Sequence, residues 1–99
     1  MLTITAIIRV KAGTEQAMRD ALLVVADHVR LNEPQTIGFF VSQDAADPCL
    51  FTTYERFADQ AAMDRHNGCE TVARFYASAT SFLDGEVMLV KAVEVSAEG

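Results

Sequence analysis

Residues 38–57 read GFFVSQDAADPCLFTTYERF, a sequence with the pattern of a β-hairpin. Two runs rich in aromatic and β-branched residues, Thr36–Gln43 and Leu50–Phe57, flank the turn-forming sequence DAADP at 44–48. This pattern is typical of two antiparallel strands joined by a short connection. Gly38, inside the first of these strands, indicates a β-bulge or a close approach to a neighbouring group.

Two elements are predicted before this hairpin. A strand covers residues 2–10, where the sequence LTITAIIRV is rich in Ile and Thr. A helix follows from a cap at Thr14 to about Leu31, and its apolar residues have helical spacing. The buried stripe of this helix consists of Met18, Leu22, Val25 and Val29.

The sequence after the hairpin predicts a split helix and a last strand. Asp59 is placed to cap a short helix that ends at Gly68, a left-handed C-cap. A second helical piece covers about 69–83, and a strand covers 86–95. The order is therefore βαββαβ. It predicts a single α+β domain over residues 1–99 with a ferredoxin-like fold, a four-stranded antiparallel sheet with helices on one face.

The face of this sheet that lies away from the helices is expected to be buried by another element or another chain. Alternation along the strand 50–57 places Phe51, Thr53, Glu55 and Phe57 on one face. We predict that this face lies away from the helices, where so much apolar surface rarely stays exposed in a monomer. The simplest cover is a second copy. The expected homodimer is a dimeric α+β barrel with a cavity between the copies, in which Phe51 and Phe57 are buried only when the partner is present.

Composition narrows the class of protein. The 99 residues are 51% apolar, which is typical of one folded domain. The net charge of −6 disfavours binding to nucleic acid. No apolar run has the length of a membrane span and no signal peptide is visible, so we expect a cytoplasmic protein without a membrane partner. Cys49 and Cys69 are then expected to be reduced thiols.

Glu55 and His66 are the candidate catalytic residues. Glu55 lies in mid-strand among apolar residues, where a carboxylate needs a partner, and His66 closes the short helix that follows. They predict an acid–base pair in an apolar cavity; the alternative is a buried pair that only pins the helix to the strand. A helix-end histidine is expected to contribute little packing. The predicted substrate-binding residues are Phe51, Thr53, Tyr54, Phe57, Met63 and Tyr76.

No cofactor or metal site is predicted. The sequence contains neither a glycine-rich phosphate loop nor a CxxC pair. His28 and His66 are far apart in the sequence, and no carboxylates accompany them at metal-ligand spacing. His28 is expected to have a structural or solvent-facing role near the end of its helix.

Three segments resemble the antibiotic biosynthesis monooxygenase (ABM) domain family: MLTITAIIRVKAGTEQAMRDAL, the hairpin at 38–57, and DQAAMDRHNG. The resemblance implies a small dimeric α+β barrel. It is closest in pattern to quinol monooxygenase-like members and to enzymes that process the phosphorylated autoinducer-2 signal. Those members share a Gln-Asp turn, a Phe-x-x-Tyr-Glu strand and a following His, which here are residues 43–44, residues 51–55 and His66.

Two other subgroups of that family match less well. Members that oxidise polyketide anthrones carry Asn, Trp and Tyr at positions that are Thr53, Phe57 and Met63 here. Members that degrade haem carry Asn, Trp and an iron-ligating His at positions that are Ala6, His66 and Tyr76 here. The resemblance therefore does not imply either activity for this chain.

These observations predict a cofactor-free monooxygenase, or a related isomerase, that acts on a small quinol-like or enolisable compound. Two alternatives stay open: a non-catalytic module that binds a small apolar or aromatic molecule, and a dimer whose face is filled by its own aromatic side chains. A cavity of at least roughly 300 Å³ is expected of a ligand site. Oxygen uptake with quinols and anthrones would distinguish the enzyme from the binding module.

Overall fold

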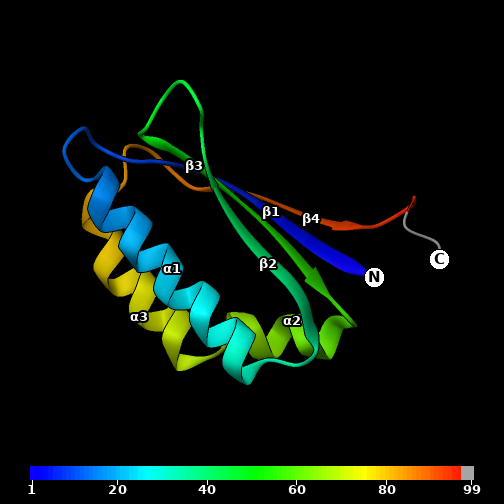
Figure 1. Ribbon diagram of the computed structural model, residues 1–99. Helices are drawn as coiled ribbons and strands as arrows, with labels where there is room; N and C mark the ends of the chain where they lie inside the picture. The colour runs from blue at the N-terminus through cyan, green and yellow to red at the C-terminus, as the bar shows by residue number, and fades with distance from the viewer. Residues whose placement is uncertain (97–99) are drawn as a thin grey trace.

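The computed structural model describes residues 1–96 and consists of a sheet with one layer of helices (Figure 1). Its elements are β1 Leu2–Arg9, α1 Glu15–Asn32, β2 Thr36–Gln43, β3 Leu50–Phe57, α2 Gln60–Asn67, α3 Glu70–Ala79, the 3-10 turn η1 Thr80–Phe82, and β4 Met88–Val93. The predicted βαββαβ order with a split second helix is confirmed.

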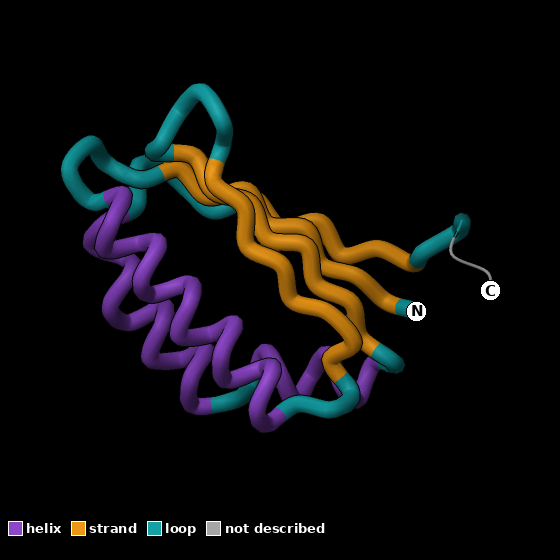
Figure 2. The backbone as a smooth tube through the Cα atoms, viewed as in Figure 1, coloured by secondary structure: helices purple, strands orange, loops and turns teal. Residues whose placement is uncertain are grey.

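The sheet has four antiparallel strands in the order β2-β3-β1-β4. All three helices lie on one side of it, with α1 and α3 packed side by side (Figure 2). This is the predicted ferredoxin-like arrangement. Because β1 lies between β3 and β4, residues far apart in sequence meet across the sheet: Glu55 pairs with Ile4, and Ile4 pairs with Lys91.

The predicted start of α2 is confirmed, and the predicted conformation at its end is wrong. The Asp59 side chain accepts a hydrogen bond from the Ala62 N–H at 2.8 Å. Gly68 has φ −94°, so it is not a left-handed C-cap. Its N–H donates to the Asp64 carbonyl at 2.9 Å and closes the last turn, after which the chain continues into α3 without the reversal that a positive φ gives.

Gly38 fulfils both expectations for a glycine inside a strand. The pairing register of β2 with β3 shifts between Thr36 and Gly38, which marks an irregularity in the ladder. A Cβ atom at position 38 would also lie 2.6 Å from the Phe40 ring. A larger residue here would therefore have to displace that ring.

The C-terminal elements are shorter than predicted. The helix expected over about 69–83 is α-helical only to Ala79 and continues as η1, and the last strand covers Met88–Val93 rather than 86–95. The Thr80 hydroxyl donates to the Tyr76 carbonyl at 2.5 Å, so the side chain takes up a carbonyl at the end of α3. Thr14 precedes α1 as expected, but its hydroxyl donates to the Lys11 carbonyl and makes no cap hydrogen bond.

The predicted orientation of β3 is wrong. Phe51 and Phe57 are 1% and 0% exposed within a single chain, because they point toward the helices. Phe51 packs in a cluster with Met18 and Leu22 of α1, and Phe57 packs with Met63 of α2. No partner is needed to bury them. Alternation alone places these residues on a common face but does not say which face the helices cover.

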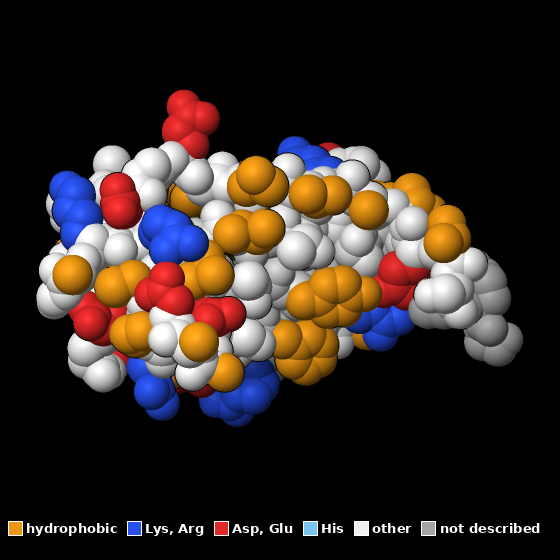
Figure 3. Space-filling model, turned by 90° about the horizontal axis from the view of Figure 1, so that it is seen from above, with side chains coloured by type: hydrophobic (Ala, Val, Ile, Leu, Met, Phe, Trp, Pro, Cys, Tyr) orange, Lys and Arg blue, Asp and Glu red, His pale blue; other side chains and the backbone are white. Residues whose placement is uncertain are grey.

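The face that lies away from the helices is formed by the opposite set of side chains. Figure 3, seen from above, shows hydrophobic side chains gathered over the sheet on this side. The large hydrophobic residues exposed on this open face are Ile7, Phe40, Tyr54, Met88 and Val90. Within residues 1–96, none of the helices has the length and apolar character required to cross a membrane.

Candidate active site

A cavity of about 290 Å³ lies between the sheet and the helices of one chain. Its apolar lining comes from β1, α1, β2, α3 and the C-terminal segment, and includes Ile4, Ala6, Ile8, Leu22, Val25, Phe39, Val72, Phe75, Val87 and Leu89. Its polar lining consists of Thr53, Glu55, His66, Asn67, Tyr76 and Lys91. A cavity was predicted between two copies of the chain; this one lies inside a single copy, and its volume is close to that expected of a ligand site.

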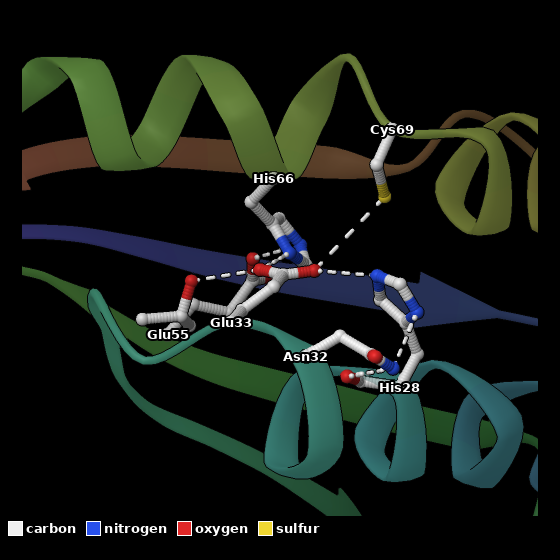
Figure 4. Close-up of polar contacts among 7 residues, drawn as sticks. His28, Asn32, Glu33, Glu55, His66 and Cys69 are labelled. Carbon is white, nitrogen blue, oxygen red and sulfur yellow. Dashed lines mark hydrogen bonds and ion pairs between the residues drawn. The ribbon is translucent and has the colours of Figure 1, made fainter.

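Glu55 is brought into the cavity wall by the alternation of β3. Its side chain is only 8% exposed. The Thr53 hydroxyl, two residues earlier on the same face, donates to Oε2 of Glu55 at 2.7 Å. Nε2 of His66 lies 3.3 Å from Oε1 of Glu55 (Figure 4). Both carboxylate oxygens therefore have a partner, which is what a buried carboxylate requires.

His66 comes from the last turn of α2 and is held between two carboxylates. Its Nδ1 lies 2.9 Å from Oε1 of Glu33, on the side opposite Glu55. The rings of Phe39 and Phe57 lie 5.5 and 5.4 Å from the imidazole. Burial by itself would lower the pKa of His66, but the hydrogen bonds and charges of Glu55 and Glu33 outweigh it and raise the pKa above its ordinary value. The arrangement therefore favours the imidazolium form.

This environment contradicts the expectation that His66 contributes little to packing. The side chain is 4% exposed and has an acidic partner on each ring nitrogen. Its removal would leave Glu55 without a cationic partner and Glu33 with His28 as its remaining one. The approach of His66 to Glu55 is present as expected, but it is part of a larger network than a single pair.

Glu33 is the member of this network that sequence reasoning missed. It follows the last residue of α1, and Oε1 also accepts a hydrogen bond from the Thr36 hydroxyl at 2.8 Å. Its Oε2 lies 3.1 Å from Nε2 of His28. A carboxylate at the C-terminal end of a helix is disfavoured by the helix dipole. That unfavourable placement was the available signal that Glu33 needs cationic partners.

Of the predicted substrate-binding residues, Thr53 and Tyr76 line the cavity. The pKa of Tyr76 is raised, first by burial and then by the charge of Glu55. Phe51, Phe57 and Met63 are buried in the core and do not line the cavity.

Tyr54 is on the open face of the sheet, so its predicted contact with the cavity is wrong. Its hydroxyl donates to Glu94 at 2.7 Å. The adjacent residues of β3 point in opposite directions, and Glu55 is the one directed toward the helices.

Lys91 also lines the cavity and was not predicted. It is the one charged residue of the β4 sequence MLVKAV, and its strand pairing places it on the same sheet face as Glu55, two strands away. The sequence did contain an indication of this role, because Lys91 is a single cation within an otherwise apolar strand. Glu55 and Lys91 thus give the cavity an acidic and a basic group at different points of its wall.

A family model described as antibiotic biosynthesis monooxygenase matches residues 1–78. The chain belongs to the ABM family. The match includes β1, the hairpin, Glu55 and His66, so the resemblance noted in the sequence is confirmed.

Solved structures similar to this ABM protein extend over nearly its whole length. A structure from Pseudomonas aeruginosa is 26% identical, with 96% of this chain and 94% of that chain covered and a TM-score of 0.87. One from Nitrosomonas europaea is 19% identical, with coverage of 96% and 99% and a TM-score of 0.90. A third, named antibiotic biosynthesis monooxygenase, is 22% identical, with coverage of 96% and 99% and a TM-score of 0.88. The comparison with curated proteins gives no match.

Proposed function

We propose that this ABM protein is a cofactor-independent monooxygenase, or a related isomerase, that deprotonates a small quinol-like or enolisable substrate in its cavity. The observation that carries the proposal is the Glu55–His66 contact of 3.3 Å in the wall of a largely apolar cavity of about 290 Å³. Membership of the ABM family supports the oxygenase version. The volume of the cavity is near the lower end of the range for ligand pockets, so it suits a small substrate.

Glu55 is the proposed base. Its carboxylate accepts a proton from an acidic O–H or C–H group of the substrate, and His66 fixes the orientation of that carboxylate through Nε2. Glu55 and His66 are themselves buried, so their charges act on a substrate beside them with less screening than at the surface. Lys91, elsewhere in the lining, is available to attract the anion that forms.

The deprotonated substrate then reacts with molecular oxygen. In the oxygenase version, an activated CH2 group loses two hydrogens and gains one oxygen atom as a carbonyl, and the second oxygen atom leaves as water. The substrate itself supplies the electrons, so the protein has to provide only the base and a dry cavity. In the isomerase version, the proton returns to a different atom of the same substrate and no oxygen is consumed.

We also propose that the protein is a homodimer whose copies pack through the open face of the sheet. Ile7, Phe40, Met88 and Val90 expose large apolar side chains on this face, which is unfavourable in water. The family resemblance implies the same assembly. In this dimer each copy keeps its own cavity on the helix side, and the interface does not have to supply the catalytic residues.

The test is oxygen consumption by the purified protein with a panel of quinols and anthrones. We expect turnover of at least one compound, and a loss on the order of 10² or more in Glu55→Gln, because the amide cannot accept the proton. The matched control is Glu70→Gln, the same change at an exposed residue of α3. Turnover that survives Glu55→Gln at the wild-type rate would overturn the role of Glu55.

The second candidate function is a non-catalytic module that binds a small aromatic molecule. The observation that favours it is the full pairing of His66 by Glu33 and Glu55, which a purely structural network would also show. In that case, compounds of the panel bind in equilibrium dialysis without oxygen consumption or isomerisation.

A further inference from the structure

We propose that His28, Glu33 and Cys69 form a binding site for Zn²⁺ or a similar thiophilic divalent cation, outside the cavity. The ligand atoms are one imidazole nitrogen, one carboxylate oxygen and one sulfur, and they all lie within 4.8 Å of one another. This group contains neither Glu55 nor the cavity-facing side of His66. The site lies outside the cavity, and Glu33 connects it to His66.

The three residues come from two places in the chain that the fold brings together. His28 lies in the last turns of α1 and Glu33 directly follows that helix, whereas Cys69 is the residue before α3. The packing of α1 against α3 sets the distance between them. Figure 4 shows the His28 ring and the Cys69 thiol directed toward the same carboxylate of Glu33.

The distances fit a tetrahedral ion. Zn²⁺ binds nitrogen and oxygen at about 2.0–2.2 Å and sulfur at about 2.3 Å, so two tetrahedral ligand atoms lie roughly 3.3–3.6 Å apart. Here Nε2 of His28 is 3.1 Å from Oε2 of Glu33, and Sγ of Cys69 is 4.0 Å from the same oxygen. The second distance is long for a hydrogen bond to an oxygen. An ion between the three groups therefore requires the Cys69 thiol to move closer to Oε2 of Glu33.

Glu33 divides its two oxygens between the two sites. Oε1 is occupied by His66 and the Thr36 hydroxyl, at 2.9 and 2.8 Å. These contacts fix the carboxylate with Oε2 toward His28 and Cys69. Ligating carboxylates are commonly held in this way by a second layer of hydrogen bonds.

The ring of His28 has a partner for its other nitrogen. Nδ1 lies 3.3 Å from Nδ2 of Asn32. The same Nδ2 donates to the His28 carbonyl at 3.2 Å, which holds the amide beside the ring. Metal binding through Nε2 requires the proton on Nδ1, so the Asn32 amide has to move away from Nδ1 when the ion binds.

The site is accessible from solvent. A second pocket of about 280 Å³ is lined by all three proposed ligands together with Asn32 and Arg65. All three ligands are half-buried. Three protein ligands beside an accessible pocket leave the fourth tetrahedral position to water or to a small anion.

Cobalt titration tests the proposal without any substrate. Co²⁺ takes the same tetrahedral sites as Zn²⁺, and a cobalt–thiolate bond gives a charge-transfer absorption in the near ultraviolet. We expect this absorption to saturate at one Co²⁺ per chain and to be displaced by Zn²⁺. Cys69→Ser should remove the band, and His28→Gln should weaken Zn²⁺ binding at least about tenfold in competition with a chromophoric chelator.

The matched control is Cys49→Ser, which removes the other thiol, in the turn between β2 and β3. This variant should bind Co²⁺ and Zn²⁺ as the wild type does. Absence of a saturable thiolate band in the wild type would overturn the proposal. A band that survives Cys69→Ser, or that disappears in Cys49→Ser, would do the same. Circular dichroism of each variant verifies that the fold is retained, and His28→Gln remains decisive if Cys69→Ser does not fold.

Discussion

The two faces of β3 carry different kinds of side chain and face different surroundings. Toward the helices, Phe51 and Phe57 are buried in the core, and Glu55 between them is buried against His66. Away from the helices, Tyr54 is 41% exposed and Arg56 pairs with Glu94 near the surface. The helix side of β3 thus carries a buried charge network beside a cavity, and the other side carries a half-buried ion pair beside apolar side chains.

The helix-facing side chains stabilise the fold of a single chain, whereas those of the open face are suited to contact with a second copy. On the helix side, Phe51 and Phe57 of β3 and the carboxylates of Glu33 and Glu55 all have partners within one copy. The open side still exposes large apolar side chains. We therefore expect substitutions on the first face to change folding and activity, and those on the second to change association.

The largest expected effect is that of Phe57→Ala on stability. The side chain is fully buried against Ile4 and Met63, so its loss leaves a cavity in the core. We expect the free energy of unfolding to fall by about 3–5 kcal/mol. Urea denaturation measures this change. The matched change on the open face, Phe40→Ala, should cost less than about 1 kcal/mol when the chain is monomeric; equal losses would mean that the two faces are buried alike.

His66→Ala is expected to destabilise the chain by about 3 kcal/mol. The change removes the cation that lies 2.9 Å from Glu33 and 3.3 Å from Glu55, and only Glu33 keeps a second histidine partner, His28. Thermal and urea unfolding measure the loss. His66→Ala in combination with Glu33→Gln and Glu55→Gln should recover part of it, because no unpaired charge then remains buried. A loss under 1 kcal/mol for the single variant would show that solvent reaches the carboxylates.

The fold was predictable from the sequence because its signals are local. Alternation in the hairpin at 38–57, the apolar stripe of α1 and the Asp59 cap each depend on neighbouring residues, and together they give the βαββαβ order. The choice of sheet face was not predictable in this way. It depends on which side the connections carry the helices, and apolar residues occur on both sides of β3 and β1.

The candidate site was predictable only in part. Glu55 and His66 stand out because a charge within an aromatic strand and a histidine in the next helix are unusual. Glu33 and Lys91 enter from elements that are distant in sequence, so only the packing of α1 and the pairing of β4 with β1 reveal them. Tyr54 was misplaced together with the rest of its strand face.

Substitutions on the open face are expected to weaken the association of two copies into a dimer. Val90 is half-exposed there, opposite Thr5 of β1. Val90→Asp places a charge in the proposed interface, and we expect the dimer dissociation constant to rise at least tenfold, about 1.4 kcal/mol. Analytical ultracentrifugation over a dilution series measures it. The matched control is Val24→Asp on the exposed side of α1, which should leave the dissociation constant unchanged. Equal dissociation constants for the two variants would show that the interface is not on the open face.

The smallest expected effect is a pH dependence that comes from the open face. Hydrogen bonds from Arg56 and Tyr54 lower the pKa of Glu94 from 4.5 to about 2. Because the folded state lowers this pKa, the stabilisation is fully present above pH 4.5 and is lost as the pH falls toward 2.

Urea midpoints of the wild type and Arg56→Gln test this sign. We expect the wild type to be slightly more stable than Arg56→Gln at neutral pH. This difference in urea midpoint should disappear between pH 4.5 and 2, where Glu94 of the wild type takes up its proton. Raised salt should narrow the gap at neutral pH as well, since this ion pair lies near the surface. A gap that stays constant down to the acid limit would mean that Arg56 stabilises the open face by packing rather than by its charge.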